Sequence, residues 1–179
     1  RLSPWEPPRF LWALLEGALG AHPSYGLLEV APQLPSDWRW CQVRRLPYRG
    51  GSLSWFLARY PDEMRLYTTD SVRTPLAVER LADDISDAVT PVGGGTHVSA
   101  FAEPGRILIC VGSTVETKQS HLLAVRRLLE NARRYEVELY SSEIGRWTRL
   151  GAFRGGALER LSVEIEGGGF AVFHLRPGR

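Results

Sequence analysis

The chain has 179 residues, 44% of them hydrophobic, and its 22 basic and 20 acidic residues leave a formal net charge of +2. This is enough for one ordinary domain or two small ones, and the hydrophobic content with so little net charge argues against intrinsic disorder. The basic residues, all arginine except Lys118, are interleaved with acidic residues, so the basic block typical of nucleic-acid-binding proteins is missing. Apolar runs fall short of the roughly 20 residues that span a bilayer. We therefore expect neither nucleic acid nor a membrane as a partner.

The first element that the sequence predicts is one short helix. Residues 1–8 are proline-rich, and Pro7 and Pro8 stand where helices begin, because the fixed φ of proline suits the first turn. The run from Phe10 to Gly20 is apolar on nearly all sides, and its final glycine is a natural C-terminal stop. Such a helix must be covered by other elements, and the sequence offers no second strong helix to cover it.

After the helix the hydrophobic pattern changes to a period of two residues, with turn-forming residues about every ten positions. This texture is typical of an antiparallel β-sandwich. The predicted strands are residues 27–30, 38–44, 52–59, 64–69, 76–81, 98–101, 107–111, 135–140, 161–166 and 170–175. The uninterrupted apolar run 107–111 predicts a central strand buried on both faces. We interpret Gly93–Gly95 and Gly167–Gly169 as hairpin turns.

One segment, residues 120–134, fits two structures. Its leucines and Val125 suit one face of a helix, and they equally suit a strand over 122–125 followed by a turn at Glu130 and Asn131. We favour the strand because the surrounding segments are β. The fold class is then mainly β, with one or more antiparallel β-sandwiches after one apolar helix. Residues 1–24 form the helix and junction, and residues 25–179 the β-sandwich region, which could divide again near residues 70–75.

The sequence contains no catalytic or metal-binding motif that we identify. Cys41 and Cys110 lie in apolar runs without a CxxC pair or a histidine at ligand spacing, so we favour free thiols over a disulfide. Asp83, Asp84 and Asp87 lack the glycine and the distal glutamate of a calcium-binding EF-hand loop, which favours a turn with solvated acids. We expect no cofactor and no metal, and we name no catalytic residue.

Aromatic residues provide the candidates for carbohydrate contact, because their flat faces can stack on sugar rings. The tryptophans that invite this interpretation are Trp38, Trp40, Trp55 and Trp147. Trp38 and Trp40, two residues apart, are expected on one face of a strand. Tryptophan is also a usual core residue of a sandwich, and we favour packing in a core or a domain interface. Near the start of the chain, Trp5 and Glu6 are further candidates, with a solvated loop as the favoured alternative.

One stretch, Leu14 to Arg49, resembles a known family. The run 14–20, Leu-Leu-Glu-Gly-Ala-Leu-Gly, precedes 28–38, Leu-Glu-Val-Ala-Pro-Gln-Leu-Pro-Ser-Asp-Trp, and an arginine-rich strand ending in Arg-Leu-Pro-Tyr-Arg-Gly-Gly. This resembles the junction in six-hairpin glycoside hydrolases related to glycogen-debranching amylo-alpha-1,6-glucosidases. There, the last helix of an (α/α)6 toroid leads into a C-terminal β-domain. Residues 30–38 carry most of the resemblance.

The resemblance implies a non-catalytic accessory end of a larger bacterial glycoside hydrolase that acts on alpha-glucosidic or related linkages. The catalytic carboxylates of that family lie on toroid loops, and no residue here matches their motifs. The expected partner is an upstream catalytic (α/α)6 domain in the same or another chain, and the opening Arg1 in place of Met leads us to expect a longer polypeptide. We expect a cytoplasmic location. The alternative is a self-contained carbohydrate-binding β-sandwich module, for which an oligosaccharide is the partner.

Overall fold

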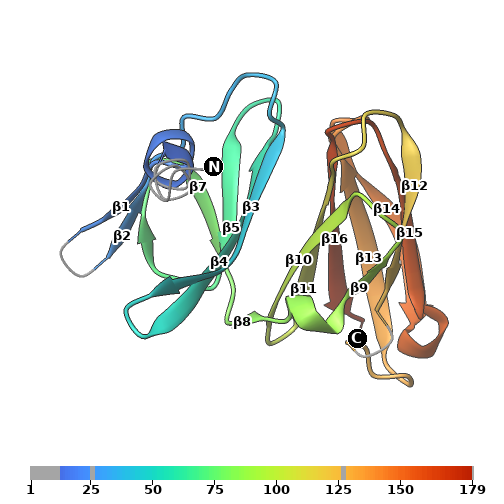
Figure 1. The fold of residues 1–179 in the computed structure, drawn as a ribbon. Coiled ribbons are helices and arrows are strands. Elements are labelled where there is room, and N and C mark those ends of the chain that lie inside the picture. The colour runs from blue at the N-terminus through green and yellow to red at the C-terminus, as the bar shows by residue number, and fades with distance from the viewer. Residues whose placement is uncertain (1–12, 25–26, 126–127, 179) are drawn as a thin grey trace, which may run out of the picture.

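The computed structural model describes residues 13–24, 27–125 and 128–178, and Figure 1 shows a chain built mainly of strands. The strands are β1 (Ala21–Pro23), β2 (Leu28–Val30), β3 (Trp40–Tyr48), β4 (Gly51–Arg59), β5 (Met64–Thr68), β6 (Val72–Arg73), β7 (Ala77–Arg80), β8 (Asp83–Asp84), β9 (Thr90–Val92), β10 (Thr96–Glu103), β11 (Arg106–Ser113), β12 (Gln119–Ala124), β13 (Arg134–Ser141), β14 (Arg146–Arg154), β15 (Arg160–Ile165) and β16 (Phe170–Pro177). The helical pieces are η1 (Ala13–Ala18), η2 (Ser86–Ala88) and η3 (Gly155–Ala157). The mainly β fold class is confirmed. In the described part of the chain, no helix is long and apolar enough to cross a membrane.

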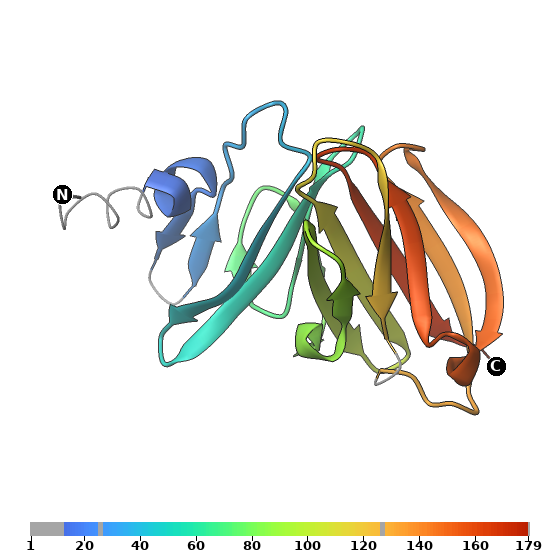
Figure 2. The same cartoon turned by 45° about the vertical axis from the view of Figure 1, so that its right-hand side comes forward.

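The strands form four sheets. Sheet A has the order β1-β2-β6, sheet B β3-β4-β5-β7, sheet C β14-β13-β16-β11-β10-β8, and sheet D β15-β12-β9. Pairing is antiparallel except between β2 and β6 and between β5 and β7. The chain leaves sheets A and B after Arg80 and enters sheet C at Asp83, and Figures 1 and 2 show the two pairs of sheets side by side. The division of the chain into domains stays a prediction.

The four sheets are stacked, with a hydrophobic core between each neighbouring pair. The A–B core contains Trp55, Leu57 and Leu66, and the B–C core contains Phe56, Tyr67 and Phe170. Among the described residues, the C–D core is the largest, and it is built around Ile109, Val137, Ile165 and Phe173. Sheets B and C are therefore the inner layers, each covered on both of its faces.

The inner position of sheets B and C explains their continuous apolar runs. In β11, Ile109 and Val111 face the C–D core, while Leu108 and Cys110 face the B–C core. Successive side chains of a strand point to opposite faces, so a strand between two cores buries all of them. The predicted central strand buried on both faces is confirmed.

The ambiguous segment 120–134 resolves as a strand and a turn, as favoured from the sequence. Strand β12 pairs with β15 and β9, and a turn follows it before β13. Each predicted strand overlaps a strand of the structure. The sequence did not predict β14, which forms the outer edge of sheet C. No residue of β14 is buried, so the strand lacks a period-two hydrophobic pattern, and a bulge at Leu150 also interrupts its side-chain alternation.

The interpretation of both triple-glycine turns as hairpins is wrong. The strands on either side of Gly93–Gly95 are β9, which lies in sheet D, and β10, which lies in sheet C. The strands beside Gly167–Gly169 are β15 in sheet D and β16 in sheet C. Both turns thus carry the chain from one layer of the sandwich to the next. At Gly167 an ideal Cβ would lie 2.0 Å from the carbonyl oxygen of Glu116, so the crossing needs glycine for close approach.

The N-terminal helix is short in the described residues. The first part of the predicted helix lies outside them, and η1 is a π-helix in which Leu19 N donates to Leu14 O at 3.0 Å. Gly20, with φ of +55°, ends it as predicted, and an added Cβ there would meet the backbone of Ala31. A short strand, β1, follows where the sequence suggested only a junction.

Candidate functional site

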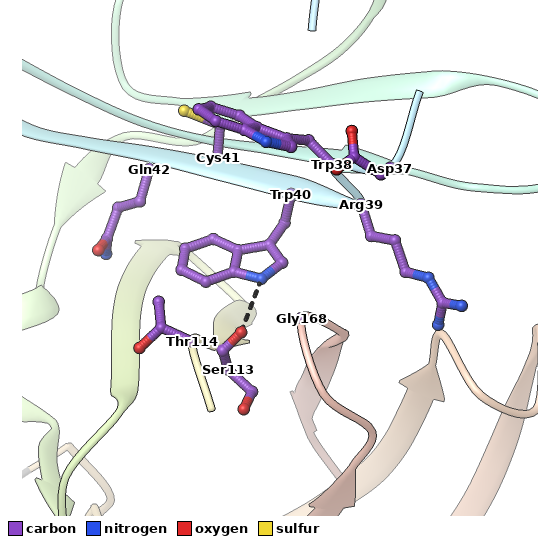
Figure 3. Close-up of a pocket in the computed structure, with 9 residues that line it drawn as sticks. All are labelled: Asp37, Trp38, Arg39, Trp40, Cys41, Gln42, Ser113, Thr114 and Gly168. Carbon is purple, nitrogen blue, oxygen red and sulfur yellow. Dashed lines mark hydrogen bonds between the residues drawn. The ribbon is translucent and has the colours of Figure 1, made fainter. Parts of the chain in front are cut away.

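Two of the four carbohydrate-contact candidates line one cleft of about 380 Å³. Figure 3 shows it between the start of β3 in sheet B and the segments beside the end of β11 and the turn before β16 in sheet C. The lining residues are Asp37, Trp38, Arg39, Trp40, Cys41, Gln42, Ser113, Thr114 and Gly168. Trp5 and Glu6 lie outside the described residues, so their contact with sugar stays a prediction.

Trp40 is a packing residue of the B–C core. Its ring is stacked on that of Phe56, with 5.6 Å between centroids and 4° between planes. The indole Nε1–H donates to the carbonyl oxygen of Ser113 at 3.3 Å. The ring also lies so close to Gly112 that an added Cβ would be 2.3 Å from its Cε2 atom. These contacts and the hydrogen bond of the polar edge leave little of this indole for a ligand.

Trp38 is the exposed aromatic residue of the cleft, with 39% of its surface accessible. Figure 3 shows its indole on the Cys41 side of β3, opposite to Trp40. The expectation that the two tryptophans share a face is therefore wrong. Strand alternation applies only within a strand, and β3 begins at Trp40, so Trp38 lies in the preceding loop.

The loop that carries Trp38 is held by the guanidinium of Arg59. Its Nε donates to the carbonyl oxygen of Trp38 at 3.1 Å, and its Nη2 donates to those of Leu34 at 3.3 Å and Pro35 at 3.2 Å. In addition, Arg59 N donates to Arg39 O at 2.8 Å. Charged donors make the stronger class of hydrogen bond, so the exposed indole is presented from a fixed loop.

The polar groups that line the cleft suit binding rather than catalysis. Arg39 Nη1 lies 3.3 Å from Glu166 Oε2, and Gln42 Nε2 donates to Val98 O at 2.6 Å and Ser99 Oγ at 2.7 Å. The carboxylate of Asp37 is exposed at the rim. Burial raises the pKa of the Cys41 thiol, and a backbone hydrogen bond with Gln42 lowers it by less, so the pKa is about 11. The thiol therefore stays protonated at neutral pH. The cleft can offer an acceptor and donors, while the exposed indole of Trp38 lies on the other side of β3.

The acidic residues near β8 are engaged in the structure. Asp87 pairs with Arg44 at 2.8 Å and with Arg45. The carboxylate of Asp84 accepts hydrogen bonds from Ser86. Burial alone would raise the pKa of Asp84, but these hydrogen bonds outweigh the effect of burial and leave the pKa below its usual value. Within residues 13–24, 27–125 and 128–178, no group of three or more His, Cys, Asp or Glu could hold a metal ion.

The two thiols are free, and they lie on different sides of sheet B. Cys110 is buried in the B–C core, while Cys41 is half-buried against the A–B core. Burial raises the pKa of Cys110 well above its ordinary value. The preference for free thiols over a disulfide is confirmed.

Several residues of the cleft escaped sequence analysis. Asp37 and Arg39 lie on either side of Trp38 in the sequence. The available signal for both was this pattern of a tryptophan between two charged residues, next to a proline-rich loop. Ser113 and Thr114 lie more than 70 residues away in sequence, at the end of another sheet, and only the stacking of sheets B and C brings them to the cleft.

No protein-family model and no curated protein matches the sequence. Among solved structures, the chain is similar to parts of several glycoside hydrolases. It matches alpha-galactosidase I from Mortierella vinacea with 9% identity and a TM-score of 0.34, covering 47% of this chain and 21% of that one. It matches the bifunctional glucanase-xylanase CelM2 from a metagenome library with 8% identity and a TM-score of 0.34, covering 47% and 16%.

A third similarity is to a Paenibacillus polymyxa xyloglucanase, with 8% identity, a TM-score of 0.33, and coverage of 47% of this chain and 17% of that one. The chain thus spans about a fifth or less of the length of these enzymes. Similarities of this size concern part of the β fold, and the printed activities belong to those proteins.

Proposed function

We propose that the chain is the accessory C-terminal β-region of a glycoside hydrolase acting on alpha-glucosidic or related linkages, and that it covers part of an upstream catalytic (α/α)6 domain. The observation that carries this proposal is the apolar helix η1, of which no residue is buried. It lies where the sequence resembles the junction between toroid and β-domain in six-hairpin glycoside hydrolases.

The packing of η1 explains why a second surface is needed. Leu15 and Ala18 contact the A–B core on one side. Leu14, which is half-buried, is not part of that core, and Ala13 is exposed. A helix that is apolar on nearly all sides is stable in water only when both sides are covered. An upstream helical domain would cover the side that residues 13–24, 27–125 and 128–178 leave exposed, and the β-region would then support the last helix of the toroid.

The test compares Leu14→Asp in the longest polypeptide that the gene encodes and in the 179-residue chain alone. A buried carboxylate is strongly unfavourable, so the long polypeptide should lose thermal stability and its hydrolysis of α-glucans. The short chain, in which Leu14 is half-buried and outside the A–B core, should lose much less thermal stability. Glu16→Gln, on the same helix, is the matched control and should leave both unchanged. Equal destabilisation of both polypeptides, or a gene that ends with this chain alone, would overturn the proposal.

A second function, carbohydrate binding on the exposed indole of Trp38, is favoured by one observation. An indole that is 39% exposed is presented from a loop fixed by Arg59, next to the exposed carboxylate of Asp37. Trp38→Ala should abolish retention on an immobilised glucan without changing the melting temperature, and Trp38→Phe should keep part of it. Retention of the alanine variant at the wild-type level would exclude Trp38 as the carbohydrate contact.

A further inference from the structure

A second groove lies at the junction of sheets B and C, away from the Trp38 cleft. Two adjoining cavities of about 280 and 500 Å³ share Arg65 of β5 and Trp147 of β14 in their walls. We call the pair the Trp147 groove. Its lining comes from the β4–β5 turn, β5 and β7 of sheet B, and from β11, β13, β14, β16 and the β13–β14 turn of sheet C.

Trp147 provides an exposed and well-supported aromatic surface in this groove. Trp147 is 41% exposed although it lies within strand β14. Tyr140, its direct partner on β13, has its ring centroid 5.7 Å away at 59°, and the His174 ring lies 6.2 Å away at 63°. Tilted ring contacts of this kind hold the indole in position at a low cost in conformational entropy on binding.

The charges in the Trp147 groove balance one another. Its walls contain four arginines and four carboxylates: Arg65, Arg106, Arg146, Arg176, Asp62, Glu63, Glu79 and Glu138. Arg65 lies 3.5 Å from Glu79, which also pairs with Arg106. Arg176 lies 3.7 Å from Glu138. The groove therefore attracts neither anions nor cations strongly, yet it presents many hydrogen-bond donors and acceptors next to an aromatic face.

The buried imidazole of His174 keeps this balance at neutral pH. Burial lowers its pKa to about 4, and the nearby Arg176 and Arg106 lower it further in the same direction. The ring is uncharged at pH 7 and adds a polar wall without a net charge.

We propose that the Trp147 groove binds a neutral oligosaccharide, with one sugar ring stacked on Trp147 and hydroxyl groups bonded to the paired arginines and carboxylates. The balanced charge argues against a charged ligand, and the eight charged residues argue against an apolar one. Two adjoining cavities that share one aromatic residue suit a chain of several sugar units. The inference does not depend on the accessory role of the chain or on the Trp38 cleft.

The experiment measures ligand protection of Trp147 in the polypeptide as the gene encodes it. Hydroxyl-radical oxidation followed by mass spectrometry reports Trp147 separately from other sites, so binding at a catalytic centre does not interfere. Maltoheptaose, cellohexaose and xylohexaose are the neutral probes, and an oligogalacturonate is the charged comparison. Saturable protection of Trp147 by a neutral probe, with no change at Phe153, supports the proposal. Phe153 is a good reference because it is 37% exposed on the same strand and outside the groove.

Variants complete the test. Trp147→Ala should weaken the binding of the protecting oligosaccharide about tenfold, as loss of a stacking contact predicts, whereas Trp147→Phe should recover part of the affinity. Phe153→Ala is the matched control and should bind like the wild type, and thermal melts establish that each variant is folded. The proposal is overturned if no neutral probe protects Trp147 up to its solubility limit. It is also overturned if only the oligogalacturonate protects, or if Trp147 is already covered without ligand.

Discussion

Replacing Gly112 with alanine would place a methyl group where the ring of Trp40 now lies. The ideal Cβ would be 2.3, 2.4 and 2.5 Å from the ring atoms Cε2, Cδ2 and Cε3, closer than carbon atoms approach in proteins. The ring cannot easily move, because it is stacked on Phe56 and bonded to Ser113. Gly112 is also not in the left-handed region, so the penalty arises from overpacking and not from backbone strain.

We expect Gly112→Ala to lower the free energy of unfolding by about 1–3 kcal/mol, the usual cost of an overpacked core. Urea titration followed by circular dichroism measures this change. Gly94→Ala is the control: its added Cβ would have no atom within 4 Å, and its φ is not in the left-handed region. That substitution should change the free energy by less than about 0.5 kcal/mol.

A double-mutant cycle with Trp40→Ala tests the cause of the penalty. Trp40→Ala alone should cost about 3 kcal/mol, at the lower end for tryptophan because the residue is only half-buried. In that background the cavity accepts the new methyl group, and Gly112→Ala should cost close to nothing. Additive effects of the two substitutions, within about 0.5 kcal/mol, would refute the view that the Trp40 ring is what the methyl group meets.

Three further predictions concern the cores and their titratable groups. Ile109→Ala, in the C–D core, should cost about 2–5 kcal/mol by urea titration, while Ile144→Ala, at a residue 56% exposed, should be nearly neutral; a small loss at Ile109 would contradict its core position. Because the pKa of His174 is about 4 in the fold and 6.5 ordinarily, the unfolded chain binds the proton more tightly. The free energy of unfolding should therefore decrease as the pH falls from about 6.5 towards 4, by on the order of 3 kcal/mol. His174→Gln should remove that part of the pH dependence, and a variant with the same pH profile as the wild type would contradict the assignment to His174. The thiols of Cys41 and Cys110 should resist alkylation at pH 8 in the native state and react in urea, since burial raises both pKa values; rapid native labelling would show that one of them is accessible.

Hydrophobic spacing along the sequence was sufficient to predict most of the strands. Residues 161–166 alternate cleanly and form β15, and the unbroken apolar run 107–111 lies in β11, between two cores. Burial on one face or on both faces leaves a different periodicity in the sequence, and this signal is local. The strand at β14 was missed because neither of its faces is buried, so its sequence lacks the alternation on which such a prediction depends, and the bulge at Leu150 interrupts it further.

The candidate site was predicted only in part. Sequence analysis selected Trp38 and Trp40, and both line the cleft, yet their opposite orientations follow from where β3 begins. The position of a strand's first residue depends on its partner, here the pairing of Trp40 with Ala58 on β4. Trp147 was recognised as a tryptophan that could contact sugar, but the sequence could not show that it lines two cavities.

What the sequence by itself determined is the β class, the approximate strands and the burial of the central strand, because these depend on residue types at short spacing. Only the tertiary structure decided which strands share a sheet. A glycine-rich turn such as Gly167–Gly169 is compatible with a hairpin and with a crossing between layers, since both need close backbone approach and left-handed φ values. The choice is made by distant partners: β16 pairs with β11 and β13, and β15 pairs with β12, because these pairings bury the C–D core.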